Sequence, residues 1–121
     1  MTIRFYKDLD VWQKSMDLVE EVYRVSQQFP SEERFGLTNQ IRRSAVSIPA
    51  NIAEGHGRLH LGDYIRFLSI ARGSLMETET HLAIAIRLGF VEHERAAVAH
   101  DLIQHVGRLL NGLIRALQTK L

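Results

Sequence analysis

Residues 40–58, QIRRSAVSIPANIAEGHGR, carry polar side chains at steps of three and four, the spacing that places residues on one face of an α-helix. A set of apolar residues follows the same spacing about a quarter-turn away, as expected for a ridge that packs in a core. The polar stripe consists of Gln40, Arg43, Ser47, Asn51, Glu54 and Arg58. The apolar ridge consists of Leu37, Ile41, Ala45, Ile48 and Ile52. This stretch therefore predicts a helix whose polar stripe borders the core.

A second row of polar residues lies in the next segment, residues 61–88. If the two helices fold back about a turn near His60, residues whose numbers sum to about 120 lie at the same level of an antiparallel pair. The expected pairs are Glu54 with Arg66, Arg43 with Glu77, Arg58 with Asp63, Gln40 with Thr80, and Ser47 with Gly73. We expect the opposite charges to form a polar ladder that fixes the register of the hairpin.

Hydrophobic periodicity predicts four helices, at residues 9–28, 32–57, 62–88 and 92–118, with almost no strand pattern. Four long helices joined by short turns indicate an all-α, up-down-up-down antiparallel four-helix bundle, and the length fits one domain over residues 1–121. Pro49 is expected to kink the second helix, because proline removes a backbone hydrogen bond. The apolar arc of the first helix is wider than one bundle partner requires, so part of it is expected to meet another chain.

Composition excludes several classes of function. The 121 residues include no cysteine, which rules out disulfides, a thiolate nucleophile and cysteine-ligated zinc. No apolar run approaches the roughly 18 residues that indicate a membrane span. The first ten residues mix both charges and lack the apolar region of a secretory signal. We therefore expect a cytoplasmic protein that does not bind membranes.

Motifs for metal, cofactor or nucleophile chemistry are missing from the sequence. Di-metal sites in helical bundles use Glu-x-x-His, which does not occur here. His56 and His60 have the spacing of two metal ligands, but Gly57 is expected to break the helix between them. There is no Gly-x-Ser-x-Gly elbow and no glycine-rich phosphate loop. The sequence favours a protein without metal, cofactor or catalytic residues; an enzyme centred on Glu54 and Arg58 is a distant alternative, because a carboxylate that faces an arginine stays ionised and shuttles protons poorly.

The middle of the chain has more basic than acidic residues, although the formal net charge of the whole chain is only +1. Between residues 36 and 76 the acids are only Glu54 and Asp63. The candidate set for binding RNA or DNA is Arg42, Arg43, Arg58, Arg66 and Arg72. If the ladder neutralises part of this set, Arg42 and Arg72 are the cations left over. A nucleic-acid platform is expected to carry a clear surplus of bases on one face.

Three segments carry a family resemblance: FYKDLDVWQKSMDL, FPSEERFGLTNQIRRSAVSIPANIAEGHGR, and DYIRFLSIARGSLMETETHL followed by LGF. They resemble the small bacterial four-helix-bundle proteins encoded by intervening sequences of 23S rRNA genes, and the resemblance extends to Phe90. It implies a homo-oligomer, with a pentameric ring as the expected arrangement. The accessory protein of diversity-generating retroelements, which engages nucleic acid and a reverse transcriptase, is similar to this family.

Two functional hypotheses follow. The first is a non-enzymatic homo-oligomeric scaffold, suggested by the wide apolar arc of the first helix and by a ladder that satisfies its own charges. The alternative is an RNA- or DNA-binding oligomer that uses an arginine-rich face of the second and third helices. The near-neutral charge of this chain departs from the basic barrel of the retroelement protein.

Overall fold

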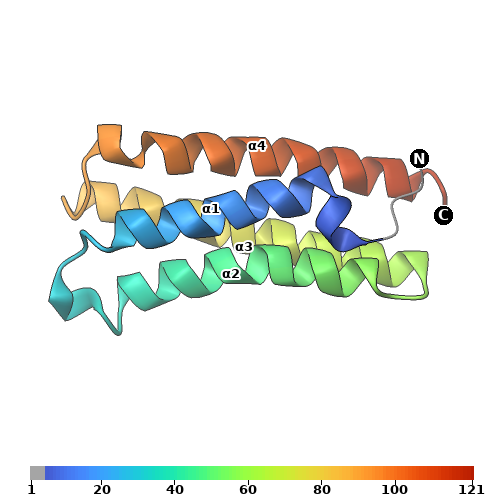
Figure 1. Cartoon of the computed structure of the whole chain (residues 1–121), viewed down its shortest axis with the longest axis horizontal. Coiled ribbons are helices and arrows are strands. Elements are labelled where there is room, and N and C mark those ends of the chain that lie inside the picture. Colours follow the sequence, from blue (N-terminus) through green and yellow to red (C-terminus); the bar gives the residue numbers. More distant parts are fainter. Residues whose placement is uncertain (1–4) are drawn as a thin grey trace.

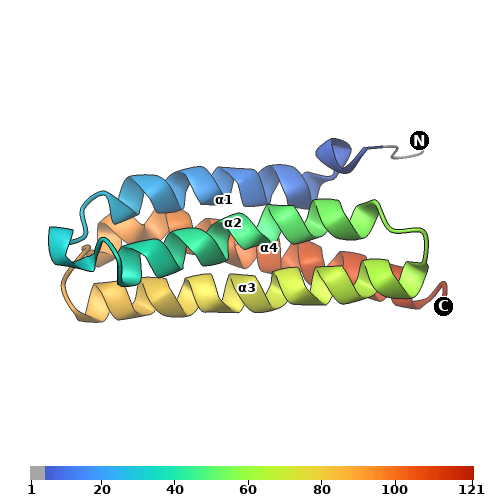
Figure 2. The same ribbon diagram turned by 90° about the horizontal axis from the view of Figure 1, so that it is seen from below.

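Four helices run side by side in the computed structural model, which describes residues 5–121 (Figures 1 and 2). The elements are η1 (Tyr6–Asp8), α1 (Asp10–Ser26), η2 (Ser31–Glu33), α2 (Leu37–His56), α3 (Leu61–Arg87) and α4 (His93–Gln118). η1 and η2 are single turns of 3-10 helix, and the described residues contain no strand. The predicted all-α four-helix bundle is confirmed.

Each helix packs against the next one in sequence, and α1 also packs against α4. The α2–α3 contact is the most extensive of the four. In Figure 1 the α1–α2 and α3–α4 connections lie at one end of the molecule and the α2–α3 turn lies at the other. The chain therefore passes back and forth along the long axis, which brings the polar residues of α2 beside those of α3.

The core lies along the centre of the bundle. The apolar ridge predicted for α2 is buried along its whole length, from Leu37 to Ile52. Leu18 of α1, Leu68 of α3 and Leu110 of α4 are fully buried beside it. Burial of a side chain of this size contributes about 1.5–3 kcal/mol to the free energy of unfolding. The ridge was predictable because helical spacing alone places its residues on one side.

The second helix begins later than its sequence predicts. Residues 31–33 form a separate turn, and α2 begins at Leu37. The Glu33 carboxylate accepts a hydrogen bond from the Leu37 backbone N–H at 3.0 Å. Glu33 thus satisfies one of the N–H groups that a helix start leaves without an intrahelical partner, and it does so from outside the helix. The Ser31 hydroxyl bonds the neighbouring Glu32 at 3.3 Å and caps no helix.

Pro49 lies inside α2, and the helix continues through it to His56. The predicted kink at this residue stays a prediction.

Residues 1–4 lie outside the described part of the chain. They include the start of the ten-residue segment in which the sequence shows no secretory signal. No helix within residues 5–121 is long and apolar enough to cross a membrane.

The end of α2 packs tightly against the start of α3 at Gly55. A Cβ atom added there would lie 2.8 Å from the Phe67 Cβ and 3.2 Å from the Tyr64 carbonyl oxygen. These distances are too short for a methyl group, so only glycine lets the helix ends meet as they do. Gly73, by contrast, is exposed, and a Cβ added to it would meet nothing within 4 Å.

Candidate functional site

The predicted polar stripe of α2 lies at the surface, along the groove between α2 and α3. Arg43, Gln40, Glu54 and Arg58 are exposed, while Ser47 and Asn51 are half-buried. The groove has a volume of about 320 Å³. Its lining residues are Asn39, Gln40, Arg43, Ser44, Ser47, Ser74 and Glu77. Gln40, Arg43, Ser47 and Glu77 therefore come together as members of one groove, whereas Glu54, Arg58, Asp63 and Arg66 lie outside it.

The charged members of the predicted ladder pair within their own helices. Arg58 donates to the Glu54 carboxylate at 3.0 Å, four residues earlier on α2. Arg66 lies 3.8 Å from the Asp63 carboxylate, three residues earlier on α3. The predicted cross-helix pairs of Glu54 with Arg66 and of Arg58 with Asp63 are therefore wrong.

An aromatic ring explains this choice of partners. The guanidinium carbons of Arg58 and Arg66 each lie 4.7 Å from the centre of the Phe67 ring. Stacking on a ring is favourable for a guanidinium. It leaves both arginines within reach of a carboxylate on their own helix, where neighbours three or four residues apart meet at little conformational cost.

Arg43 and Glu77 line opposite sides of the same groove, but within the described residues they form no ion pair shorter than 4.0 Å. Both side chains are exposed to water. An exposed ion pair contributes only about 0–1 kcal/mol to the free energy of unfolding. This gain hardly exceeds the conformational entropy lost when two long side chains are held in one geometry. The predicted charge ladder is thus corrected at this pair as well.

Hydroxyl groups connect the two helices instead. The Ser44 and Thr78 hydroxyl oxygens lie 2.8 Å apart, as do those of Ser47 and Ser74. Asn51 donates to the Ser47 hydroxyl at 2.9 Å. The Ser47 contact lies one residue from the predicted level of Gly73, so the predicted antiparallel register is close to the observed one. Short hydroxyls fit where long charged side chains would separate the helices.

His81 extends this hydroxyl cluster toward the surface. Its Nδ1 lies 3.3 Å from the Ser44 hydroxyl. Burial lowers the pKa of His81 below its ordinary value, and the nearby Glu77 carboxylate opposes this shift more weakly. Burial also raises the pKa of the Tyr64 phenol at the other end of α3. His81 Nδ1 and the Ser44 hydroxyl thus form one hydrogen bond in which either group can be the donor, and Ser44 also contacts Thr78.

The five arginines predicted as a nucleic-acid site do not gather on one face. Arg58 and Arg66 lie at the α2–α3 turn, Arg43 lies in the α2–α3 groove, and Arg72 lines a groove between α3 and α4. Arg42 is turned toward α1. The predicted set is thus divided among several places on the bundle.

Arg42, which the sequence leaves as a spare cation, is occupied by contacts with α1. Its Nε donates to the Ser26 hydroxyl at 2.8 Å, and its guanidinium carbon lies 4.5 Å from the centre of the Tyr23 ring. A terminal nitrogen also donates to the Tyr23 carbonyl at 3.4 Å. Arg42 therefore joins α1 to α2 and is poorly placed to bind a ligand.

One buried charge was missed by the sequence reasoning. Glu21 is 6% exposed and accepts hydrogen bonds from Arg95 of α4 at 2.9 Å and from Arg24 at 3.2 Å. Helical spacing could have predicted this burial. Glu21 lies three residues after Leu18 and four before Val25, so it shares the side of α1 that carries these core residues. Burying a carboxylate requires such partners.

Among residues 5–121, no group of three histidine or acidic side chains is placed to hold a metal ion.

Fold and grooves together define the class of protein: an all-helical bundle with polar grooves between its helices. The sequence profile of the 23S rRNA-intervening sequence proteins matches residues 7–112, so the chain belongs to this family. The resemblance expected from the sequence motifs is thereby confirmed.

A solved structure supports the same assignment. It is a crystal structure of a protein with unknown function from the S23 ribosomal protein family of Bacteroides thetaiotaomicron. The two chains are 28% identical and superpose with a TM-score of 0.79 over 86% of this chain and 97% of that chain. No curated protein sequence matches this chain.

Proposed function

We propose that this protein is a non-enzymatic homo-oligomeric scaffold whose subunits meet through the α1–α2 face. The observation that carries the proposal is a row of apolar side chains that the bundle leaves uncovered. Met16 and Tyr23 of α1 are 36% and 41% exposed, and Val46 of α2 is 43% exposed. Together with half-buried Trp12 and Val19, these residues are named the α1–α2 apolar stripe.

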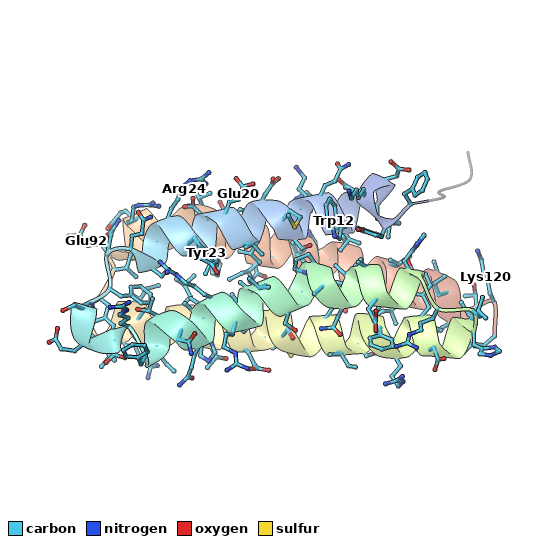
Figure 3. All side chains as sticks on the ribbon, turned by 60° about the horizontal axis from the view of Figure 1, so that its bottom comes forward. Trp12, Glu20, Tyr23, Arg24, Glu92 and Lys120 are labelled. Carbon is cyan, nitrogen blue, oxygen red and sulfur yellow. The ribbon has the colours of Figure 1, made fainter. Side chains whose placement is uncertain are left out.

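Helical spacing supports one continuous surface. Trp12, Met16, Val19 and Tyr23 follow one another at steps of four, three and four, so they share a side of α1. In Figure 3, Tyr23 lies between the α1 and α2 ribbons, while Glu20 and Arg24 lie on the other side of α1. Adjacent exposed apolar side chains of this kind mark interaction sites more often than isolated ones do.

The surroundings of the stripe resemble a protein–protein interface. Tyr23 and Val46 line a hollow of about 570 Å³ together with Asn39, Arg42, Arg43 and Ser47. Tyrosine and arginine are enriched among the residues that dominate binding energy at such interfaces. A polar rim around an apolar centre is also their usual composition. The family resemblance adds the expectation of a pentamer.

The test compares two exposed valines on different faces. Val46 lies in the stripe, and Val98 of α4, 56% exposed, lies outside it. We expect sedimentation equilibrium of the unaltered chain at micromolar concentration to give an oligomer mass. Val46→Glu is expected to give monomers because it buries a charge at the interface, whereas Val98→Glu keeps the oligomer. A monomeric unaltered chain, or equal behaviour of the two variants, would reject the proposal.

RNA or DNA binding by the oligomer is the second candidate, and one cluster favours it. Arg58 and Arg66 stack on Phe67 at the α2–α3 turn, and His56 stands edge-on to Tyr64 with ring centres 5.7 Å apart. Arginines beside aromatic rings are common in single-strand binding sites. Glu54 and Asp63 reduce the positive charge of this cluster, because they pair with Arg58 and Arg66. Binding to phosphates therefore requires that several subunits of a ring add their clusters together.

Fluorescence anisotropy with labelled single-stranded RNA at low salt tests this candidate. Binding is expected to weaken steeply as salt rises, because phosphate contacts release counterions. Arg58→Glu with Arg66→Glu should abolish it, whereas Arg87→Glu, at the opposite end of α3, should not. Absence of binding at low salt, or binding unaffected by the double change, counts against this site.

A further inference from the structure

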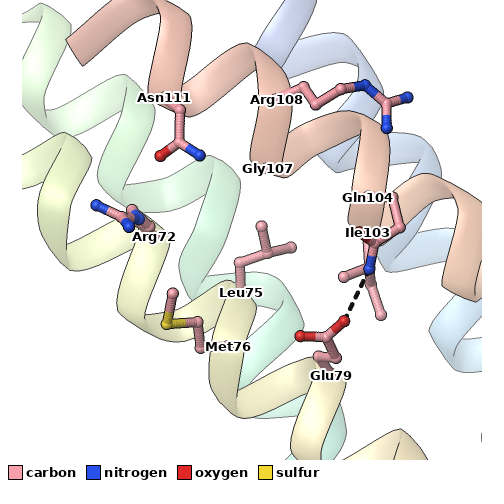
Figure 4. Close-up of a pocket in the computed structure, with 9 residues that line it drawn as sticks. All are labelled: Arg72, Leu75, Met76, Glu79, Ile103, Gln104, Gly107, Arg108 and Asn111. Atoms are coloured by element: carbon pink, nitrogen blue, oxygen red, sulfur yellow. Dashed lines mark hydrogen bonds between the residues drawn. The ribbon is translucent and has the colours of Figure 1, made fainter. Parts of the chain in front are cut away.

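A groove between α3 and α4 has the features of a small-molecule site. Its volume is about 210 Å³ (Figure 4). The lining residues are Arg72, Leu75, Met76, Glu79, Ile103, Gln104, Gly107, Arg108 and Asn111. Leu75 and Ile103 are 5% and 3% exposed, so the floor of the groove is apolar and belongs to the core. Apolar floors with a few polar groups at the edge are typical of ligand sites.

The two ends of the groove differ in polar character. At one end the Gln104 amide donates to the Glu79 carboxylate at 2.8 Å, which joins α4 to α3 (Figure 4). Arg72 and Asn111 lie at the other end, on facing helices (Figure 4). Among residues 5–121, no hydrogen bond or ion pair engages the side chain of either residue. The acid in the groove is therefore occupied, while a guanidinium and an amide present unused donors.

A glycine keeps the middle of the groove open. Gly107 faces Leu75, and a Cβ added to it would lie 3.4 Å from the Leu75 Cδ2. A side chain at this position would thus extend over the apolar floor between the two ends. Gly112, five residues further along α4, has nothing within 4 Å of such a Cβ. The groove consequently combines donors at one end with the apolar side chains of Leu75 and Met76 next to them, and Met76 is 53% exposed.

We propose that the α3–α4 groove binds a small organic acid with a short apolar chain. The carboxylate accepts hydrogen bonds from Arg72 and Asn111, and the chain lies over Leu75 beside Gly107. Guanidinium groups match carboxylates with two parallel hydrogen bonds. Arg108 also lines the groove; its guanidinium is directed away from Arg72 in Figure 4 and adds positive potential without a direct contact.

The size of the groove limits the ligand. Pockets for drug-sized molecules have volumes of about 300–1,000 Å³. The groove, at about 210 Å³, is smaller than that range, which favours a short aliphatic chain such as that of octanoate. The lining carries two arginines against one glutamate, so an anion is favoured over a cation. This site is separate from the α1–α2 apolar stripe and does not depend on the scaffold function.

Three probes separate the parts of the proposed ligand: octanoate, 1-octanol and acetate. Octanol has the chain without the charge, and acetate has the charge without the chain. Isothermal titration of the full-length protein is expected to show saturable octanoate binding at least about tenfold tighter than that of either fragment, because both ends of the groove are needed. Octanol binding as tight as octanoate, or no saturable octanoate binding, overturns the proposal.

Matched variants locate the site. Arg72→Met should weaken octanoate binding about tenfold or more, the usual effect of losing a hydrogen bond to a charged group. Arg87→Met, an exposed arginine outside the groove, should leave it unchanged. Gly107→Ala should weaken binding and Gly112→Ala should not, with circular dichroism confirming that all four variants are folded. Equal affinities across the four overturn the proposal, whereas Val46→Glu is expected to leave octanoate binding intact whatever its oligomeric state.

Discussion

The Thr78 hydroxyl of α3 lies 2.8 Å from the Ser44 hydroxyl of α2, at a point where both residues are buried. Thr78 also donates to the Ser74 carbonyl in its own helix at 2.9 Å, and Ser44 contacts the Ile41 carbonyl at 3.0 Å. Because a hydroxyl has one proton, one of the two donates to the carbonyl of its own helix while the other donates across the interface. The two helices with the largest shared contact are joined by small neutral groups whose polar atoms are satisfied.

Replacing Thr78 with valine tests the cross-helix contact. Thr78→Val keeps the volume and removes the hydroxyl, so we expect the free energy of unfolding to fall by about 0.5–1.5 kcal/mol. Thr80 is the matched control, because its hydroxyl donates to the Met76 carbonyl at 2.9 Å but is exposed and contacts no other helix. Urea unfolding should show a smaller loss for Thr80→Val. Equal losses would mean that the contact with Ser44 adds no stability.

The two glycines of the central hairpin should respond oppositely to alanine. At Gly55 the added methyl group would overlap Phe67 and the Tyr64 backbone, so Gly55→Ala is expected to destabilise the fold by about 1–3 kcal/mol. At Gly73 nothing obstructs the methyl group, and Gly73→Ala should stabilise the helix by up to about 1 kcal/mol. Thermal unfolding of both variants measures the difference. A stabilised Gly55→Ala protein would show that the helix ends can separate without cost.

The buried carboxylate of Glu21 should make its partner Arg95 important for stability. Arg95→Ala leaves Glu21 with Arg24 alone, and we expect a loss of about 1–3 kcal/mol because a buried charge loses a hydrogen bond. Glu20, whose pair with Arg24 is exposed on both sides, is the control, and Glu20→Ala should change stability by less than about 1 kcal/mol. Chemical denaturation compares the two, and a similar small effect for both would contradict the assigned role of Glu21.

The lowered pKa of His81 predicts a loss of stability on mild acidification. In the folded protein this ring binds a proton less readily than in the unfolded chain, because burial disfavours its charged form. The ordinary histidine pKa, about 6.5, applies to the unfolded chain, and the pKa of His81 in the folded protein is lower. As the pH falls between these two pKa values, the unfolded chain takes up the proton first. The free energy of unfolding therefore decreases in this window.

Comparing His81→Gln with the unaltered protein isolates the contribution of this ring from those of the carboxylates. Between pH 7 and pH 5 the variant should lose less stability than the unaltered chain. His100, which is exposed, supplies the control, and His100→Gln should follow the unaltered protein. An NMR titration that places the His81 pKa above the ordinary histidine value would contradict the prediction directly.

Most of the fold could be predicted from residues close together in the chain. The ridge from Leu37 to Ile52 specifies a buried helix face because side chains three and four residues apart must lie on one side of a helix. The wide apolar arc of α1 was likewise visible, and the structure leaves Met16 and Tyr23 of that arc exposed. The start of α2 was placed too early because Glu33 caps the helix from a preceding turn.

The partners of the charged residues were decided by the tertiary structure. A long arginine side chain reaches several carboxylates, and helical numbering cannot rank them. The position of Phe67 directs Arg58 and Arg66 onto one ring and leaves each with an acid of its own helix. Arg42 turns to Tyr23 and Ser26 for the same reason, since α1 offers a ring and an acceptor within reach.

The sequence by itself determined that this chain forms four helices with a shared apolar core, because helical periodicity is a local property of the residues. It also set the antiparallel register of α2 and α3 to within a residue or two. Only the tertiary structure decided that hydroxyls join these helices, that Gly55 packs against Phe67 and Tyr64, and that the α3–α4 groove opens beside Arg72. Each of these three features depends on distances between residues that are far apart in the chain. Side-chain packing sets those distances.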